Sequence, residues 1–163
     1  MRYTKVDIKT NSDLIPSYFM GSALRGAYGY ALKKTVCVNP SYKCENCFAK
    51  ENCLFYDFYE SKNVVHPFRF DIKLGAKSYE FSFYIFGDSC EKTPYLLSAF
   101  YQMFTSIGLG KEKTKIDDFT IHINDTLAYD GGEFNLPKSY IKEYKKTINS
   151  PTIILSLQTP LRM

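Results

Sequence analysis

The sequence predicts an α+β domain, because segments with the two-residue alternation of strands are interspersed with two segments of helical spacing. The chain has 163 residues, of which 45% are hydrophobic and 23% charged. That composition is ordinary for one globular domain with its own core. Aromatic residues make up 17%, with fourteen Tyr, thirteen Phe and no Trp. We therefore expect a core built largely from aromatic side chains.

The predicted elements follow one another in the order β, α, β, β, α, β. Strands are expected at 3–9, 66–74, 79–86 and 119–123, and helices at 22–36 and 94–107. Ser22 is the expected N-cap of the first helix. This order is the split βαβ pattern of the ferredoxin-like fold, which the RRM and other RNA-binding modules share. We expect one such domain over 1–163.

The two ends of the chain carry separate expectations. The N-terminus lacks the apolar stretch of a secretory signal, and no apolar run approaches the roughly 18 residues of a membrane span. Five cysteines without an export signal favour a reducing compartment, so we expect a cytoplasmic protein with no membrane partner. A last strand, expected at 152–157, leads to Met163 without a closing turn. This predicts that the chain is part of a longer protein.

Four cysteines lie in an irregular insertion at about 37–60. Their spacing is Cys37-x6-Cys44-x2-Cys47-x5-Cys53. A C-x2-C pair places two thiolates on one tight turn, and the two flanking cysteines complete the four-thiolate donor set of a structural Zn²⁺ site. An iron–sulfur cluster, or no metal and free or disulfide-bonded thiols, are the alternatives that the spacing leaves open. Cys90 is expected to be an ordinary loop thiol.

The first predicted helix contains two glycines, Gly26 and Gly29, each of which costs about 1 kcal/mol relative to Ala. Small residues along this helix would let another backbone or a ligand approach closely. Arg25 is then a cation on a rigid helix, suited to phosphate and hence to RNA. An equally favoured alternative is tight packing of the helix on the sheet, with Arg25 in solvent or in an ion pair.

A basic loop follows the second predicted helix. Lys111, Lys113 and Lys115 come directly after a Gly-x-Gly turn, where backbone N–H groups and cations can meet phosphate. Glu112 interrupts this patch. The net charge of +4 and a pI near 8.7 are compatible with a polyanionic partner. We therefore expect these three lysines to contact RNA.

Together these motifs resemble the N-terminal region of CRISPR-associated RAMP proteins, specifically the precursor-crRNA-processing endoribonuclease family. The matching residues of the family's glycine helix and Cys-rich segment are Gly21, Leu24, Arg25, Gly26, Gly29, Ala31, Leu32, Cys37, Cys44, Cys47 and Cys53. Residues 106–111 (SIGLGK) resemble the family's glycine-rich loop, and 159–162 (TPLR) resemble the motif that opens its C-terminal domain. The motifs occur in the family's order.

The resemblance implies a domain that binds CRISPR repeat RNA and takes part in processing precursor CRISPR RNA. It also implies a C-terminal domain and other CRISPR-associated subunits as partners, and cleavage without a catalytic metal. The lysines of 111–115 stand where the family is richer in arginine, which weakens any claim of bidentate phosphate recognition. Two alternatives stay open: a non-catalytic scaffold subunit of a crRNA effector complex, and a general zinc-stabilised RNA-binding module.

The candidate catalytic residues of this sequence are histidines. Cleavage without metal needs a base and an acid, and the chain has two histidines, His66 and His122. His122 alternates with apolar neighbours and is expected on the other face of its strand, mainly as a surface residue. His66 precedes a proline and is expected to lead into a strand. The family's RNA-cleaving residues vary among members, so the resemblance assigns none here and leaves open whether this chain holds the catalytic half.

Overall fold

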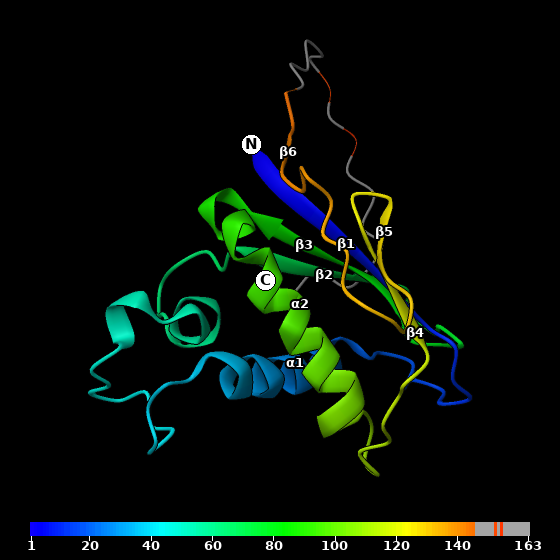
Figure 1. The fold of residues 1–163 in the computed structure, drawn as a ribbon, viewed down its shortest axis with the longest axis horizontal. Coiled ribbons are helices and arrows are strands. Elements are labelled where there is room, and N and C mark those ends of the chain that lie inside the picture. Colours follow the sequence, from blue (N-terminus) through cyan, green and yellow to red (C-terminus); the bar gives the residue numbers. More distant parts are fainter. Residues whose placement is uncertain (146–151, 153, 155–163) are drawn as a thin grey trace.

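A six-stranded antiparallel sheet organises the computed structural model, which describes residues 1–145, 152 and 154. The strands are β1 (Arg2–Thr10), β2 (Phe68–Ile72), β3 (Glu80–Phe86), β4 (Phe119–Ile123), β5 (Thr126–Tyr129) and β6 (Lys142–Glu143). Their order is β2-β3-β1-β4-β5, and β6 pairs with the start of β1. The chain is thus of mixed α+β class, as the sequence predicts (Figure 1).

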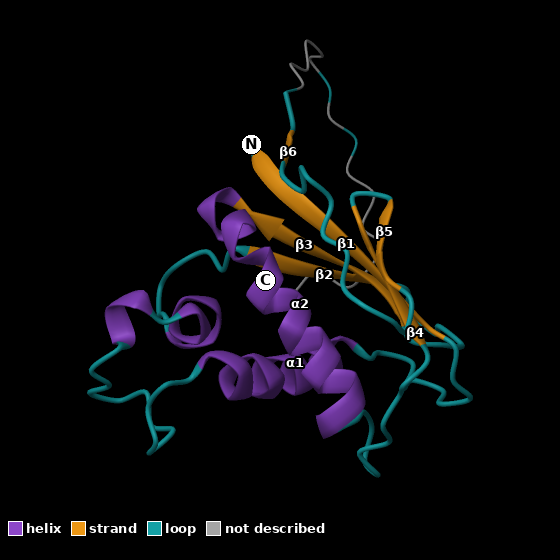
Figure 2. Ribbon diagram, viewed as in Figure 1, coloured by secondary structure: helices purple, strands orange, loops and turns teal. Residues whose placement is uncertain are grey.

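Two helices cover one face of this sheet, as Figure 2 shows. They are α1 (Gly21–Val36) and α2 (Thr93–Gln102), and α2 continues into a π-helical turn, η4 (Met103–Ile107). Three shorter turns complete the helical elements: η1 (Lys50–Asn52), η2 (Tyr56–Glu60) and η3 (Gly87–Lys92). The opposite face of the sheet carries charged and polar residues such as Lys5 and Asp7 of β1 and Ser82 of β3.

Strand alternation puts the apolar residues on the helix side. In the register of the central strand, Val6 lies opposite both Phe83 and Ile123. All three side chains are fully buried. Each such side chain contributes roughly 1.5–3 kcal/mol through burial.

Aromatic rings fill the space between helices and sheet. Tyr28 of α1 stacks on Phe100 of α2 with ring centroids 4.2 Å apart, and it also contacts Phe83 at 5.1 Å. Its hydroxyl donates a hydrogen bond to the carbonyl of Leu96 at 3.2 Å, which satisfies the polar end of a buried ring. Burial raises the pKa of Tyr28 well above its ordinary value. The expectation of an aromatic core is confirmed.

The structure corrects several expected boundaries. The N-cap of α1 is Met20 rather than Ser22, because the buried Met20 side chain fixes the entry of the chain and its carbonyl accepts the first helical hydrogen bond, from Leu24 at 2.9 Å. The strand expected at 66–74 is shorter at both ends, and β5 was not predicted. The strand expected at 152–157 lies largely outside the described residues. Within the described part of the chain, no helix is long and apolar enough to cross a membrane.

Candidate functional site

The glycine loop after η4 is a narrow hairpin closed by its own backbone. Leu109 and Thr114 exchange two N–H···O bonds, each of 2.9 Å. Gly108 has φ 80° and ψ 167°, a conformation essentially restricted to glycine. A Cβ atom at this position would lie 2.0 Å from the carbonyl oxygen of Lys113. The first glycine of the Gly-x-Gly motif is therefore required by the close approach of the two sides of the loop.

Two lysines of this loop reach a groove beside α1. Lys111, Lys113 and Lys115 are all exposed, and the first two line a groove of about 890 Å³. Its other walls are the small residues of one face of α1, the segment 14–17 and the exposed Tyr30. Lys115 is not among the residues that line it. The structure thus brings the two glycine-containing motifs of the sequence to one hollow.

The two glycines inside α1 have different surroundings. A Cβ atom on Gly26 would have no heavy atom within 4 Å beyond its own helix, whereas one on Gly29 would lie 2.7 Å from the ring of Tyr59. Gly29 therefore admits a residue of the Cys-rich segment to the helix surface. Gly26 leaves the helix backbone exposed to solvent at this position.

Arg25 is a packed cation rather than a free one. Its guanidinium lies over the rings of Tyr59 and Phe68, 5.0 and 4.8 Å from the two centroids. The Tyr59 hydroxyl donates a hydrogen bond to the Arg25 carbonyl at 2.9 Å. Burial raises the pKa of Tyr59 above its ordinary value, and the nearby guanidinium lowers that pKa by a smaller amount.

Helical geometry puts residues 25 and 29 on the side of α1 away from 23, 27 and 30. Arg25 and the loop lysines therefore lie on different sides of this helix.

The four cysteines of the insertion are free and half-buried. Cys37, Cys47 and Cys53 line one pocket of about 560 Å³, and Cys44 is not among its lining residues. Lys92 lines the same pocket and would offset the negative charge of thiolates there. In the part of the chain that the structure describes, no three His, Cys, Asp or Glu side chains are grouped as a metal site. Three soft donors around one pocket nevertheless fit the donor chemistry of zinc.

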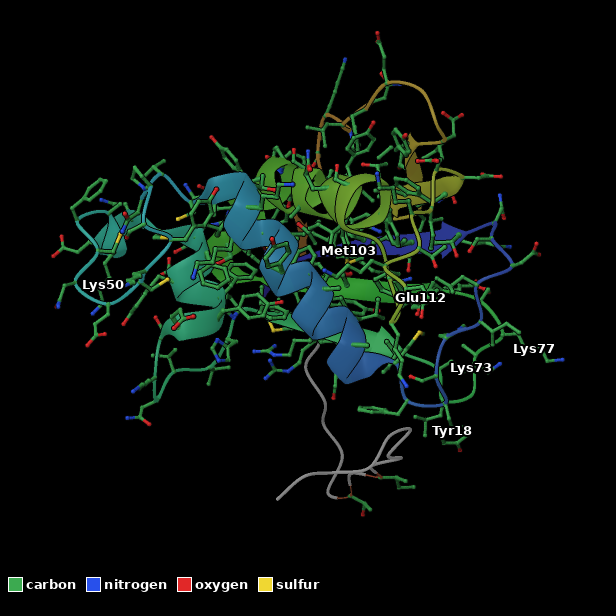
Figure 3. The ribbon with its side chains drawn as sticks, turned by 90° about the horizontal axis from the view of Figure 1, so that it is seen from below. Tyr18, Lys50, Lys73, Lys77, Met103 and Glu112 are labelled. Carbon is green, nitrogen blue, oxygen red and sulfur yellow. The ribbon has the colours of Figure 1, made fainter. Side chains whose placement is uncertain are left out.

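The cysteine pocket and the glycine loop lie far apart. In Figure 3, Lys50 of the Cys-rich segment and Glu112 of the glycine loop are on opposite sides of the molecule. Figure 1 shows the same separation, with α1 between the two regions. Any metal at the cysteines would therefore act on structure rather than directly on a ligand at the loop.

One comparison with known proteins identifies a family. Residues 1–135 match the AF_1859_N family, which is described as an N-terminal domain. The chain belongs to this family. The match includes the cysteine insertion, the glycine loop and β1 to β5. No curated protein matches the chain.

The two histidines of this AF_1859_N domain are not brought together. His122 of β4 lies on the open face, opposite Asp7 in the register of β1, and both line a hollow of about 790 Å³. Asp7 accepts a hydrogen bond from the Ser82 hydroxyl at 2.5 Å and pairs with Lys5 at 2.8 Å. His66 lies before β2, and its buried Nδ1 has no hydrogen-bond partner among the residues that the structure describes. Since β3 and β1 separate β2 from β4, the two histidines cannot act as one acid–base pair.

Sequence reasoning expected the small residues at 23 and 27 to admit a ligand or another backbone, but it missed Tyr30 as a lining residue of the groove beside α1. Ala23, Ala27 and Tyr30 line it together, and their i, i+4, i+7 spacing puts them on one helix face. The spacing was visible in the sequence, but it could not show that this face is uncovered. Sequence reasoning also missed Asn39, which lines the cysteine pocket and contacts two of the cysteines.

Proposed function

We propose that this domain is a ferredoxin-like RAMP domain that binds CRISPR repeat RNA and forms the N-terminal part of a precursor-crRNA-processing endoribonuclease. The strand order β2-β3-β1-β4, with both helices on one face, supports the finer fold because it is the order of ferredoxin-like domains. The observation that carries the function is the groove that Lys111 and Lys113 share with the small side chains of α1.

The groove has the two features by which proteins bind single-stranded RNA. Sugar–phosphate backbones need cations, and unpaired bases need exposed aromatic rings on which to stack. Lys111 and Lys113 supply the cations, and Tyr30, which is 63% exposed, supplies the ring. Tyr30 also lines a second hollow, together with Lys33, Lys34 and Tyr42. A strand of RNA that crosses α1 at Tyr30 would therefore meet cations on both sides of the ring.

The other expected RNA contacts stand differently. Arg25 is engaged by two aromatic rings, so its contribution would be to hold α1 against the Cys-rich segment, with phosphate contact through its remaining exposed edge. Lys115 lies beyond the groove and would meet only an RNA that extends past the loop. For catalysis, His122 remains the better candidate of the two histidines, because it lies on the open sheet face in a hollow.

We also propose that Cys37, Cys44, Cys47 and Cys53 hold one structural zinc ion. Bound zinc would supply a cross-link between the start and the end of an insertion that has little regular structure of its own. Three of the donors already share a pocket, and Cys44 stands in the C-x2-C turn with Cys47, whose N–H donates to the Cys44 carbonyl at 3.3 Å. Zinc content by elemental analysis, with one ion per chain expected, tests this part of the proposal.

RNA binding is tested by titrating CRISPR repeat RNA into the protein at several salt concentrations. Changing Lys111 and Lys113 together to Ala should weaken binding and reduce the slope of log K against log salt by roughly 1.4, since each lost phosphate contact on a single strand removes roughly 0.7. Changing Lys50, in the Cys-rich segment, and Lys62, just after it, together to Ala removes the same charge away from the groove and should leave the slope unchanged. Equal slopes for the two double variants would overturn the assignment of the groove.

Processing is tested separately, with the longer protein that the proposal expects. Cleavage of the cognate repeat RNA without added metal favours the processing enzyme. Repeat RNA that stays intact but bound favours the scaffold subunit of an effector complex, together with its other CRISPR-associated subunits. Equal binding of repeat and unrelated RNA favours the general RNA-binding module.

A further inference from the structure

Asn39 is the centre of the hydrogen bonding in the Cys-rich segment. Its side-chain Nδ2 donates to Cys47 Sγ at 3.4 Å and to the carbonyl of Lys43 at 3.0 Å. Its backbone carbonyl accepts from Cys37 Sγ at 3.7 Å. One residue therefore contacts the thiols of two cysteines that are ten positions apart, and it lines the pocket that they share with Cys53.

The two ends of the Asn39 side chain have separate tasks. The Oδ1 atom accepts hydrogen bonds from the backbone N–H and the hydroxyl of Ser41, at 3.0 and 2.9 Å. The bond from the backbone N–H forms an Asx turn, which shapes the backbone locally, and the bond from the hydroxyl adds to it. The Nδ2 atom points instead toward Cys47 and Lys43. An aspartate at this position would keep the turn and lose the donor to sulfur.

An N–H donor beside a cysteine sulfur favours its negatively charged form, because hydrogen bonding to the charged form stabilises it. The thiolate is the form that binds a metal. Groups that hydrogen-bond to metal ligands also fix their orientation, and their loss typically lowers metal affinity by about 10- to 100-fold. The geometry around Nδ2 fits such a role at Cys47.

We propose that Asn39 is a positioning residue of the cysteine site, whose Nδ2–H group holds the Cys47 sulfur toward Cys37 and Cys53 and raises the affinity for zinc. This inference rests on the proposed zinc site. When zinc binds, each coordinating thiol releases its proton to solvent, and the bond from Nδ2 is then made to a thiolate. Asn39 itself does not contact the metal in this arrangement.

The test compares zinc affinity, measured by competition with a chromophoric chelator, in Asn39→Asp and Asn52→Asp. Asn52 lines the same pocket, so this control adds the same charge there. Among the described residues, the Asn52 side chain makes no hydrogen bond to a cysteine, unlike that of Asn39. We expect about a 10- to 100-fold loss of affinity for Asn39→Asp, and a much smaller change for Asn52→Asp. Asn39→Ser retains an oxygen for the turn but is too short to reach sulfur, and the same loss is expected for it.

A second readout distinguishes positioning from a general loosening of the segment. With Co²⁺ in place of zinc, removal of an N–H···S bond makes the sulfur more electron-rich, so the sulfur-to-cobalt charge-transfer band should move to lower energy in Asn39→Asp but not in Asn52→Asp. Equal affinities and equal bands in the two variants would overturn the role of Asn39 and leave the zinc site standing. A wild-type protein that binds no zinc would remove both, while the RNA-binding proposal is tested independently by the lysine variants.

Discussion

Two segments of this domain each follow a helix, and they are held in different ways. The glycine loop after η4 is closed by paired backbone hydrogen bonds and anchored by Ile116, which is buried and whose N–H donates to the carbonyl of Phe104 at 3.0 Å. The insertion after α1 has mostly local turn bonds between 37 and 53. Several of its apolar side chains face solvent, and Phe48 is 79% exposed. Its first buried residue is Phe55, and before it Cys44, Cys53 and Leu54 are only partly buried against the core.

This difference shows where a cross-link would matter. Glycine at 108 and two buried anchors, Leu109 and Ile116, fix the conformation of the glycine loop. The first part of the insertion has few buried contacts, and segments of that kind open at low free energy. Its four cysteines lie in this weakly packed part, and none of them is fully buried. Four experiments test this contrast.

The largest effect is expected where the insertion meets the core. Phe58 is fully buried and stacks on Phe68 with ring centroids 5.1 Å apart. Phe58→Ala should lower the free energy of unfolding by about 3–5 kcal/mol through the cavity it creates. Phe48→Ala, the same change at an exposed position of the same insertion, should alter it by less than about 0.5 kcal/mol. Denaturant titration measures both, and similar values would show that the two halves of the insertion are packed alike.

The glycine loop is tested by a second matched pair. Gly108→Ala should destabilise the protein by about 2 kcal/mol or more, because a side chain there is strained and meets the carbonyl oxygen of Lys113. Gly110 has φ 76° but open space around it, so Gly110→Ala should cost only about 1 kcal/mol. Thermal unfolding of both variants gives the comparison. A harmless Gly108→Ala change would mean that the loop is not held by its own backbone.

The contact between α1 and the insertion is tested at the helical glycines. Gly26→Ala should stabilise the protein by roughly 0.5–1 kcal/mol, since helix propensity improves and nothing is displaced. Gly29→Ala gains the same propensity but forces the Tyr59 ring away, and overpacking of this kind costs about 1–3 kcal/mol. We expect a net loss for Gly29→Ala. Two stabilising changes would show that Tyr59 moves aside freely.

The smallest perturbation compares the cysteines themselves. Cys90 is fully buried, donates a hydrogen bond to the carbonyl of Ile85 at 3.4 Å, and burial raises the pKa of its thiol. A raised pKa keeps the thiol protonated as the pH rises, so Cys90 should stay unmodified by iodoacetamide at pH 8 in the folded protein. The four half-buried cysteines should react under the same conditions when a chelator is present. Mass spectrometry of digested protein locates the labels, and rapid labelling of Cys90 would contradict its buried place.

Local sequence patterns predicted the elements that depend on short-range periodicity. The alternation of Phe81, Phe83 and Ile85 places all three in the core face of β3, and the spacing of Leu96, Leu97 and Phe100 places them on the buried side of α2. Boundaries that depend on tertiary contacts were not predicted. The cap of α1 is set by the burial of Met20, which the sequence around it does not reveal.

The candidate site was predicted to the extent that its chemistry lies in consecutive residues. The glycine loop and its lysines form such a run, and the structure places two of the three lysines at one groove. The surroundings of Arg25 depend on Tyr59, thirty-four residues along the chain, so no local pattern could indicate its stacking. The edge strand β5, which pairs with β4, was missed. The turn between these two strands uses Asn124 and Asp125 at positive φ in place of glycine.

The central place of β1 has a consequence for how the chain is made. This first strand is the middle of the sheet, and its partners β3, β4 and β6 all come much later in the sequence. During synthesis, the edges of β1 must wait unpaired until at least residue 86 has left the ribosome. Such distant pairings slow folding and expose strand edges in the meantime. The charged residues on one face of β1, Lys5, Asp7 and Lys9, would help to keep the waiting strand from joining a neighbouring chain.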